Sequence, residues 1–193
     1  MNTITVTIKF NSAFRIATGQ ADDKADQVLD HGNPLPGRSL KGDLRAAARQ
    51  LLPATQSGDD TWRDDPLVEE VFGAPGGDGC PWHFGDGVLN DVSYRTRARI
   101  ALDPRRRVRP GAMLIGEEAR TTVATQTISQ TGTLTEEQRR LHGALLRVSA
   151  TLIDGVGHGR RRGMGWVSVT TDSERIEDDV NLVMRYVASR RES

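Results

Sequence analysis

The chain has 193 residues, 26 Lys and Arg against 26 Asp and Glu, 36% hydrophobic residues and a single cysteine, Cys80. This length predicts one domain over 1–193 with its own core. The zero formal charge excludes a uniformly basic nucleic-acid coat, and one cysteine excludes an internal disulfide. No run approaches the ~20 apolar residues of a membrane span, and no secretory pattern opens the chain, so we expect a cytoplasmic protein.

The first half of the chain predicts a strand and a helix joined by a long loop. Apolar and polar residues alternate over 4–10, which is typical of a strand with one buried face. Residues 17–34 are polar and predict a loop. Helical spacing of apolar residues begins at Ser39, which we interpret as the N-cap, and Pro53 follows the end of this helix.

The second half predicts strands around one more helix, and then a terminal helix. A small helix over 67–72 precedes extended residues 88–102, and the arginines that follow predict a ribbon with a basic tip. Thr and Val enrichment predicts a strand over 121–128. Thr135 opens a helix with a plausible cap, and a short strand from Trp166 precedes an amphipathic helix at about 175–191.

This order of elements predicts an α+β fold. Strand, helix, strands, helix and strand form the βαββαβ arrangement of a modified ferredoxin-like (RRM-like) domain with loop insertions. Its helices would cover one sheet face and leave the other face, or its rim, for a ligand.

Residues 35–45 form the first candidate phosphate site. A Pro-Gly turn leads into a helix start, where free backbone N–H groups and the positive end of the helix dipole attract anions. In the alternative reading, Ser39 merely caps the helix and Lys41 is solvated. The candidate RNA-binding residues here are Arg38, Ser39, Lys41 and Arg45.

Residues 155–165 form the second candidate site, where five glycines surround three consecutive arginines. Glycine permits close approach to a sugar-phosphate backbone, and arginine neutralises phosphates. No Gly-Lys-Ser/Thr follows, so this is not a Walker loop; a basic helix-to-strand connector is the alternative reading. The candidate RNA-binding residues are Gly157, His158, Gly159, Arg160, Arg161, Arg162 and Gly163.

Two further side chains have simpler interpretations. Trp166 could stack on a base, but a tryptophan that starts a strand is more often part of the core, and we expect it there. His142 falls on a predicted helix and is interpreted as structural.

The order of these motifs resembles the RAMP superfamily of CRISPR-associated proteins, and within it the backbone subunit of type III effector complexes. Residues 36–45 resemble the family's Pro-Gly-x-Ser-Leu-Lys-Gly segment, and Gly155 through Trp166 resemble its C-terminal glycine-rich loop. Phe72-Gly73 and Phe84-Gly85-Asp86 resemble its Phe-Gly and Phe-x-Asp pieces. The resemblance covers nearly the whole chain.

The resemblance implies a modified ferredoxin-like domain with a thumb hairpin, and several copies stacked along a guide RNA. We place the thumb at about 97–115. Its basic tip adds three candidate RNA-binding residues: Arg105, Arg106 and Arg107.

The resemblance also implies a catalytic aspartate in the loop before the Pro-Gly segment, where catalytic members cut target RNA with a metal ion. Asp26 matches by position, with Asp22, Asp23 and Asp30 as alternatives. The carboxylate would hold Mg²⁺ or orient the RNA 2′-hydroxyl. Any further metal ligands are unassigned.

The leading hypothesis is therefore a guide-RNA-binding backbone subunit of a type III-like complex, with cleavage of target RNA through Asp26 as an option. Its partners would be guide (CRISPR) RNA, target RNA, other copies of itself and other effector subunits. One alternative is a stand-alone repeat-processing endoribonuclease that uses His31 or His158. Another is a non-catalytic capping or scaffold subunit. The sequence leaves open the subtype, the number of copies and whether the target is RNA or DNA.

Overall fold

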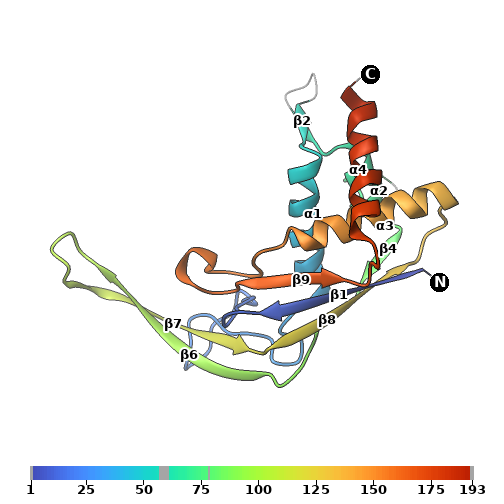
Figure 1. Ribbon diagram of the computed structural model, residues 1–193. Coiled ribbons are helices and arrows are strands. Elements are labelled where there is room, and N and C mark those ends of the chain that lie inside the picture. Colours follow the sequence, from blue (N-terminus) through green and yellow to red (C-terminus); the bar gives the residue numbers. More distant parts are fainter. Residues whose placement is uncertain (1, 57–60, 78, 192–193) are drawn as a thin grey trace.

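A computed structural model of the chain describes residues 2–56, 61–77 and 79–191. Within these ranges lie antiparallel sheets and four α-helices, so the prediction of a mixed α and β fold is confirmed at that level. The helices stand on one face of the main sheet, and a long hairpin projects from one end (Figure 1). No helix in the described part of the chain is long and apolar enough to span a membrane.

Strand β1 (Thr3–Phe10) lies in the middle of the main sheet, as its alternating pattern predicts. It runs antiparallel to both neighbours, so that Val6 lies opposite Gln126 on one side and Thr171 on the other. The order across the sheet is β4 (Trp82–Phe84), β8 (Val123–Gln130), β1 and β9 (Val167–Thr171), and β5 (Val88–Leu89) also pairs with β8. A separate small ribbon joins β2 (Thr55–Gln56) to β3 (Trp62–Arg63).

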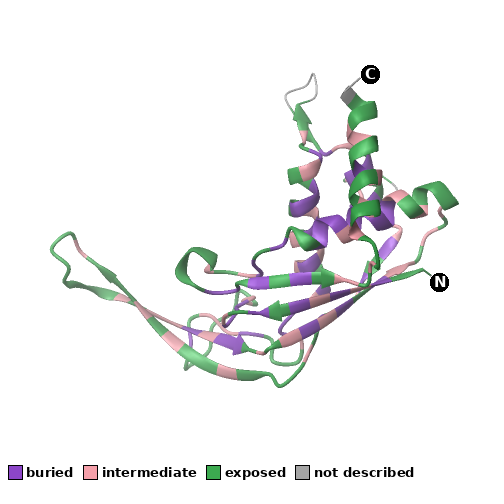
Figure 2. Ribbon diagram, viewed as in Figure 1, coloured by how far each residue is buried: buried purple, intermediate pink, exposed green. Residues whose placement is uncertain are grey.

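The core lies between this sheet and the helices. Figure 2 shows buried positions along β1 and α3. Ile4 and Ile8 of β1 face the helices and are buried, as is Leu145 of α3. Trp166 is not in this core, contrary to the sequence interpretation, because the strand alternation turns Val167 inward and leaves Trp166 outward and 49% exposed. The helices are α1 (Gly37–Leu51), α2 (Pro66–Phe72), α3 (Glu136–Thr151) and α4 (Ile176–Arg191), the last being the terminal helix expected at about 175–191.

The two long core helices begin in different ways. Thr135 and Gln138 form a reciprocal capping box at the start of α3, as the sequence predicts. Helix α1 starts at Gly37, two residues before the predicted position, and Ser39 makes no capping hydrogen bond. The interpretation of Ser39 as N-cap is therefore wrong, because the Asp86 carboxylate, from a distant part of the chain, accepts the Gly37 N–H at 2.7 Å.

The projecting hairpin consists of β6 (Ser93–Leu102) and β7 (Val108–Arg120), paired antiparallel. It includes the ribbon expected at 97–115 and extends beyond it at both ends. Its tip is exposed and lies far from the helices (Figures 1 and 2). The hairpin therefore carries its basic tip away from the core.

The loop predicted over 17–34 is attached to this hairpin along part of its length. Gln27 forms a parallel bridge with Gly116 of β7, and Ala17 pairs with Leu29 within the loop itself. The Gln27 carbonyl also accepts the Glu117 N–H at 2.9 Å. This segment is thus held beside the base of the hairpin.

Candidate nucleic-acid interface

The fold brings together the two segments in which the sequence predicts phosphate binding. The Arg160 guanidinium, in the short 3₁₀ turn Arg160–Arg162, pairs with the carboxylate of Asp43 on α1. Burial raises the pKa of Asp43, and the charge and hydrogen bond of Arg160 oppose that rise. Arg160 therefore connects the glycine-rich loop (residues 155–165) to α1, and part of its charge is already balanced.

Two glycines of the glycine-rich loop are required by packing against the chain's own backbone. Gly157 and Gly165 both have positive φ, at 69° and 71°. A Cβ at Gly157 would overlap the Arg15 carbonyl oxygen, and one at Gly165 would overlap the Val156 carbonyl oxygen. Gly163, by contrast, faces open space and leaves room for a ligand to approach its backbone.

The loop is also hydrogen-bonded to the segment after β1. The His158 N–H donates to the Arg15 carbonyl at 2.8 Å, and the Gly165 N–H donates to the Ala13 carbonyl at 2.7 Å. These bonds fix the backbone on both sides of the arginine turn. Arg161 and Arg162 are exposed, and neither pairs with an acidic side chain within the residues that the structure describes. The loop therefore presents two uncompensated guanidinium groups from a fixed support.

The start of α1 is less open to anions than the sequence suggests. The pKa of Asp86 is lowered, first by the Gly37 N–H and then by the Asn33 side chain, so its negative charge persists there. That charge opposes a phosphate at the same N–H group. Arg38 is exposed, and the Lys41 Nζ lies 5.5 Å from the centre of the Phe84 ring. Their roles in RNA binding, with that of Ser39, stay predictions.

Arg45 is paired with an acidic side chain of the protein itself. Its guanidinium pairs with the Asp64 carboxylate at 2.7 Å, and Arg49 pairs with the same carboxylate at 2.6 Å. Asp64 is almost fully buried, so this cluster joins α1 to the segment before α2. Because Asp64 balances part of its charge, Arg45 is less suited to bind an RNA phosphate than the sequence predicts.

A fully buried arginine that the sequence does not single out joins this loop to the hairpin. The Arg15 Nε donates to the Glu117 carbonyl, and its Nη1 donates to the Gln27 side-chain oxygen at 2.7 Å. The guanidinium lies over Gly116, where any Cβ would overlap it. Burial lowers the pKa of Arg15, and neighbouring Arg99 adds to that effect. From the sequence alone, a single arginine after a strand gives no indication that its side chain is buried against the hairpin.

Glu118 balances part of the positive charge at the hairpin base. It is fully buried, and its carboxylate pairs with Arg95 and, at 3.0 Å, with Arg97. Arg95 and Arg97 of the lower stem are thereby engaged. The arginines of the tip, Arg105, Arg106 and Arg107, are exposed and lie well away from the glycine-rich loop, although Arg107 also pairs with Asp103 at 3.1 Å (Figure 1).

Asp26 lies beside the hairpin stem. Its Oδ2 accepts the Ile115 N–H at 2.7 Å and its own N–H donates to the Ile115 carbonyl at 2.8 Å, while the residue stays exposed. The alternatives Asp22 and Asp30 use their carboxylates to accept backbone N–H groups of their own turns. Asp23 is exposed. Among these four carboxylates, only that of Asp26 is hydrogen-bonded to the hairpin within the described residues.

The described residues do not form a ready-made metal centre. No group of three or more His, Cys, Asp or Glu side chains in that part of the chain could hold an ion. Mg²⁺ commonly binds through one or two carboxylates together with substrate phosphates. An ion at Asp26 would therefore depend on RNA for most of its ligands, and we derive no step through it.

The three histidines considered in the sequence analysis, out of four in the chain, lie in different settings. His31 is half exposed, with its Nε2 at 3.1 Å from Glu117 and its ring stacked on Tyr94 at 3.9 Å between centres. His158 is exposed in the glycine-rich loop. His142 is buried, as a structural role requires, and its ring nitrogens contact Trp82 and Glu70, each at 3.3 Å.

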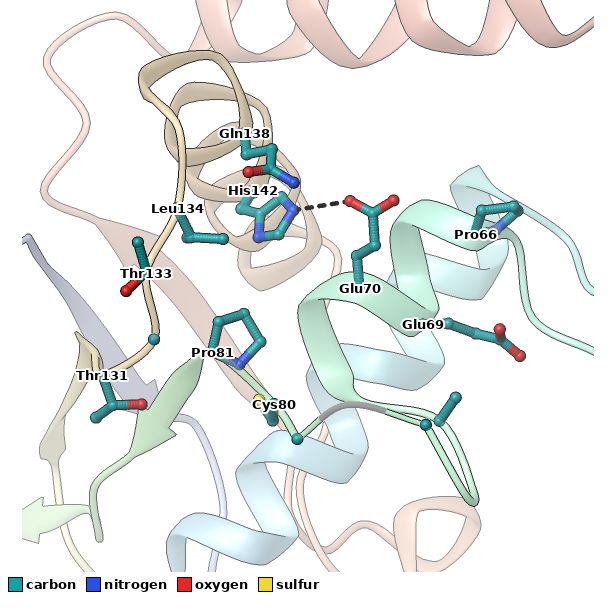
Figure 3. A pocket seen from close by; sticks show the side chains of 14 residues that line it. Pro66, Glu69, Glu70, Cys80, Pro81, Thr131, Thr133, Leu134, Gln138 and His142 are labelled. Carbon is teal, nitrogen blue, oxygen red and sulfur yellow. Dashed lines mark hydrogen bonds and ion pairs between the residues drawn. The ribbon is translucent and has the colours of Figure 1, made fainter.

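The pocket beside His142, about 650 Å³ in volume, is unsuited to phosphate (Figure 3). Its charged lining residues, Glu69 and Glu70, are acidic, and burial lowers the pKa of His142. We therefore place the candidate interface at the glycine-rich loop and the base of the hairpin, with α1 joined to the loop through the Arg160–Asp43 pair.

Comparison with known proteins identifies the family of the chain. A model of the RAMP superfamily matches residues 7–168, so the chain belongs to that superfamily. No curated protein matches the sequence significantly.

Two similar solved structures are chains of Type III-B Cmr-beta assemblies studied by cryo-electron microscopy. One, from the assembly bound to cognate target RNA, has a TM-score of 0.67 and 11% identity over 93% of this chain and 99% of that chain. The other, from the apo state, has a TM-score of 0.64 and 10% identity over 89% and 98%. At these identities, the likeness is one of fold.

Replacing Arg15 with lysine should loosen the base of the hairpin. Lysine keeps the charge but lacks the planar fork that reaches both the Glu117 carbonyl and Gln27. We expect the free energy of unfolding to fall by about 1–3 kcal/mol, because buried acceptors lose their donors. Urea denaturation measures it. The control is Arg99→Lys, on the neighbouring stem, which should change stability by less than about 0.5 kcal/mol. Equal effects of the two substitutions would contradict the role given to Arg15.

Proposed function

We propose that this chain is a guide-RNA-binding backbone subunit of a type III-like CRISPR effector complex, with several copies along one guide. The observation that carries the proposal is the pair of exposed, unpaired arginines, Arg161 and Arg162, on a loop fixed by hydrogen bonds at both sides. Membership of the RAMP superfamily supports it. So does the similarity of fold to chains of Type III-B Cmr-beta, one of them from an assembly bound to target RNA.

We also propose that the core is a modified ferredoxin-like domain. The sequence of β1, α1, β4 with β5, β8, α3 and β9 follows the βαββαβ order, and β1 pairs between β8 and β9. The single-domain assignment over 1–193 remains a prediction. In this proposal the β6–β7 hairpin is the thumb, and its tip arginines contact guide or target RNA beyond the subunit's own loop. The other partners are further copies of this chain and other effector subunits.

Removing the two free guanidinium groups should weaken RNA binding by reducing its electrostatic contribution. For Arg161→Ala with Arg162→Ala, we expect lower affinity for single-stranded RNA and a smaller dependence of log K on log salt concentration. Two lost phosphate contacts reduce that slope by up to about 1.4, at roughly 0.7 for each contact with a single strand. Fluorescence anisotropy of labelled RNA at several salt concentrations measures both quantities.

The matched control for this pair is Arg140→Ala with Arg185→Ala, which removes the same charge from exposed positions on α3 and α4. It should leave the salt dependence nearly unchanged. If the two double variants lose affinity and slope equally, the binding is a general charge effect, and the glycine-rich loop is not the site.

Cleavage of target RNA is a further part of the proposal, with Asp26 as the catalytic carboxylate and Mg²⁺ as the expected ion. Asp26 lies against the hairpin stem and remains exposed. The family resemblance implies that the thumb interrupts the pairing of guide and target, and in this proposal Asp26 acts at that interruption. Its own contribution would be to accept or orient the 2′-hydroxyl proton, or to hold the ion.

The substitution Asp26→Asn keeps an oxygen for the Ile115 N–H and removes the charge. We expect target cutting in the assembled complex to fall by about 100-fold or more, since a positioned acid or base contributes roughly 10²–10⁴. Guide binding should stay within about twofold, because the substitution leaves the arginine contacts in place. Asp30→Asn, at an alternative carboxylate of the same loop, should leave cutting unchanged if Asp26 is the catalytic residue. If cutting is unchanged in Asp26→Asn, Asp26 is not the catalytic carboxylate, and the proposal that the chain binds RNA is unaffected.

A further inference from the structure

Trp166 is a large aromatic side chain for which the fold provides no core position. It is 49% exposed at the first position before β9, directly after the glycine-rich loop. Strand alternation turns it to the sheet face opposite the helices. An exposed indole at a fixed place is a stacking surface for flat ligands.

The backbone beneath Trp166 is held on both sides. Its N–H donates to the Ser12 hydroxyl at 3.0 Å, and its carbonyl accepts the Asn11 N–H at 2.8 Å. Gly165 precedes it at positive φ, with its own N–H bonded to the Ala13 carbonyl. The indole is thus carried on a rigid support, which lowers the entropy lost when a ligand binds.

The neighbours of Trp166 on this face are polar. The burial alternation of β1 turns Lys9 outward, opposite the exposed Ser168 of β9, and Asn11 follows on the same side. The Asn11 amide nitrogen donates to the Ser168 hydroxyl at 3.2 Å, so its amide oxygen points away from that bond. A flat ligand with hydrogen-bonding edges and a negative charge would match these groups.

A hollow of about 300 Å³ begins next to these residues. Asn11 and Ser12, which follow β1, line it, together with Asp91 before the hairpin, Ser93 and Arg120 at the hairpin base, and Thr121 before β8; Asp91 brings a carboxylate to this hollow. This volume is at the lower end of small-ligand sites, which span roughly 300–1,000 Å³. Arg120 adds a cation to its rim.

We propose that Trp166 is a stacking platform for one nucleobase of the bound RNA strand, with Asn11 at the base edge and Lys9 toward the phosphate. This inference rests on the proposed RNA-binding function and names a contact within it. Trp166 lies four positions after Arg162, so their Cα atoms are at most about 14 Å apart. One short stretch of RNA can therefore contact the free guanidinium groups and the indole together. Stacking on an aromatic side chain is how proteins commonly hold single-stranded RNA.

The test is titration of a single-stranded uridine 12-mer into the full chain, followed by tryptophan fluorescence and by anisotropy of labelled RNA. The chain has three tryptophans: Trp82 is buried, Trp62 is 71% exposed and Trp166 is 49% exposed. In Trp62→Phe, RNA should still quench the emission, because Trp166 remains. In Trp166→Phe, the quenching should be lost, although Trp62 is still exposed. These two variants control for each other.

Affinity provides the second readout. Trp166→Ala should weaken binding by about 5- to 150-fold, which corresponds to roughly 1–3 kcal/mol for one stacked base. Trp166→Tyr should stay within about threefold, since it keeps an aromatic face. The salt dependence of binding in Trp166→Ala should match that of the unchanged chain, in contrast to the arginine variants, because stacking displaces no counterion.

Three outcomes decide the inference. Quenching through Trp166, with weaker binding in Trp166→Ala and near-normal binding in Trp166→Tyr, supports it. RNA binding without quenching, or with equal affinity in Trp166→Ala, overturns it while the proposed function stands. Failure of the unchanged chain to bind RNA at all would overturn the proposed function and this inference together. Far-ultraviolet circular dichroism verifies that each variant is folded.

Discussion

The buried guanidinium of Arg15 is the contact on which the arrangement of the interface depends. Its side chain donates to the Glu117 carbonyl of β7 and to Gln27 of the adjoining loop, and its carbonyl accepts the His158 N–H. Three segments that are far apart in sequence therefore meet at one residue. Because Gly116 and Gly157 lack side chains, all three can approach it closely. The glycine-rich loop and the hairpin base are consequently positioned relative to each other.

Although the net charge of the chain is zero, its arginines fall into two groups, those paired with acidic side chains and those left exposed. Several are engaged by acidic partners, including Arg45 by Asp64, Arg97 by Glu118 and Arg160 by Asp43. Others remain exposed, at the turn of the glycine-rich loop and at the hairpin tip. Phosphate recognition needs cations that are not already paired. The engaged arginines fix the scaffold, and the exposed ones are left for RNA.

Local patterns predicted the helices and the longer strands but not the short strands β2, β3 and β4, and long-range contacts account for most of what was missed. Period-two alternation identifies β1, and a capping box identifies the start of α3, because both signals lie within a few residues. The cap of α1 comes from Asp86, and the burial of Arg15 depends on β7, so neither is visible locally. Candidate loops could likewise be found from their composition, whereas the use of Gly157 and Gly165 in internal packing, and the outward position of Trp166, required the fold.

The central claim is that copies of this chain follow one another along a guide RNA through the glycine-rich loop. The most direct measurement is nuclease protection of RNA that co-purifies with the assembled protein, read at single-nucleotide resolution. The account predicts protected lengths that increase by a constant few nucleotides for each added subunit, and a loss of protection in Arg161→Ala with Arg162→Ala. A single short footprint of fixed length, or no protected RNA, would contradict it.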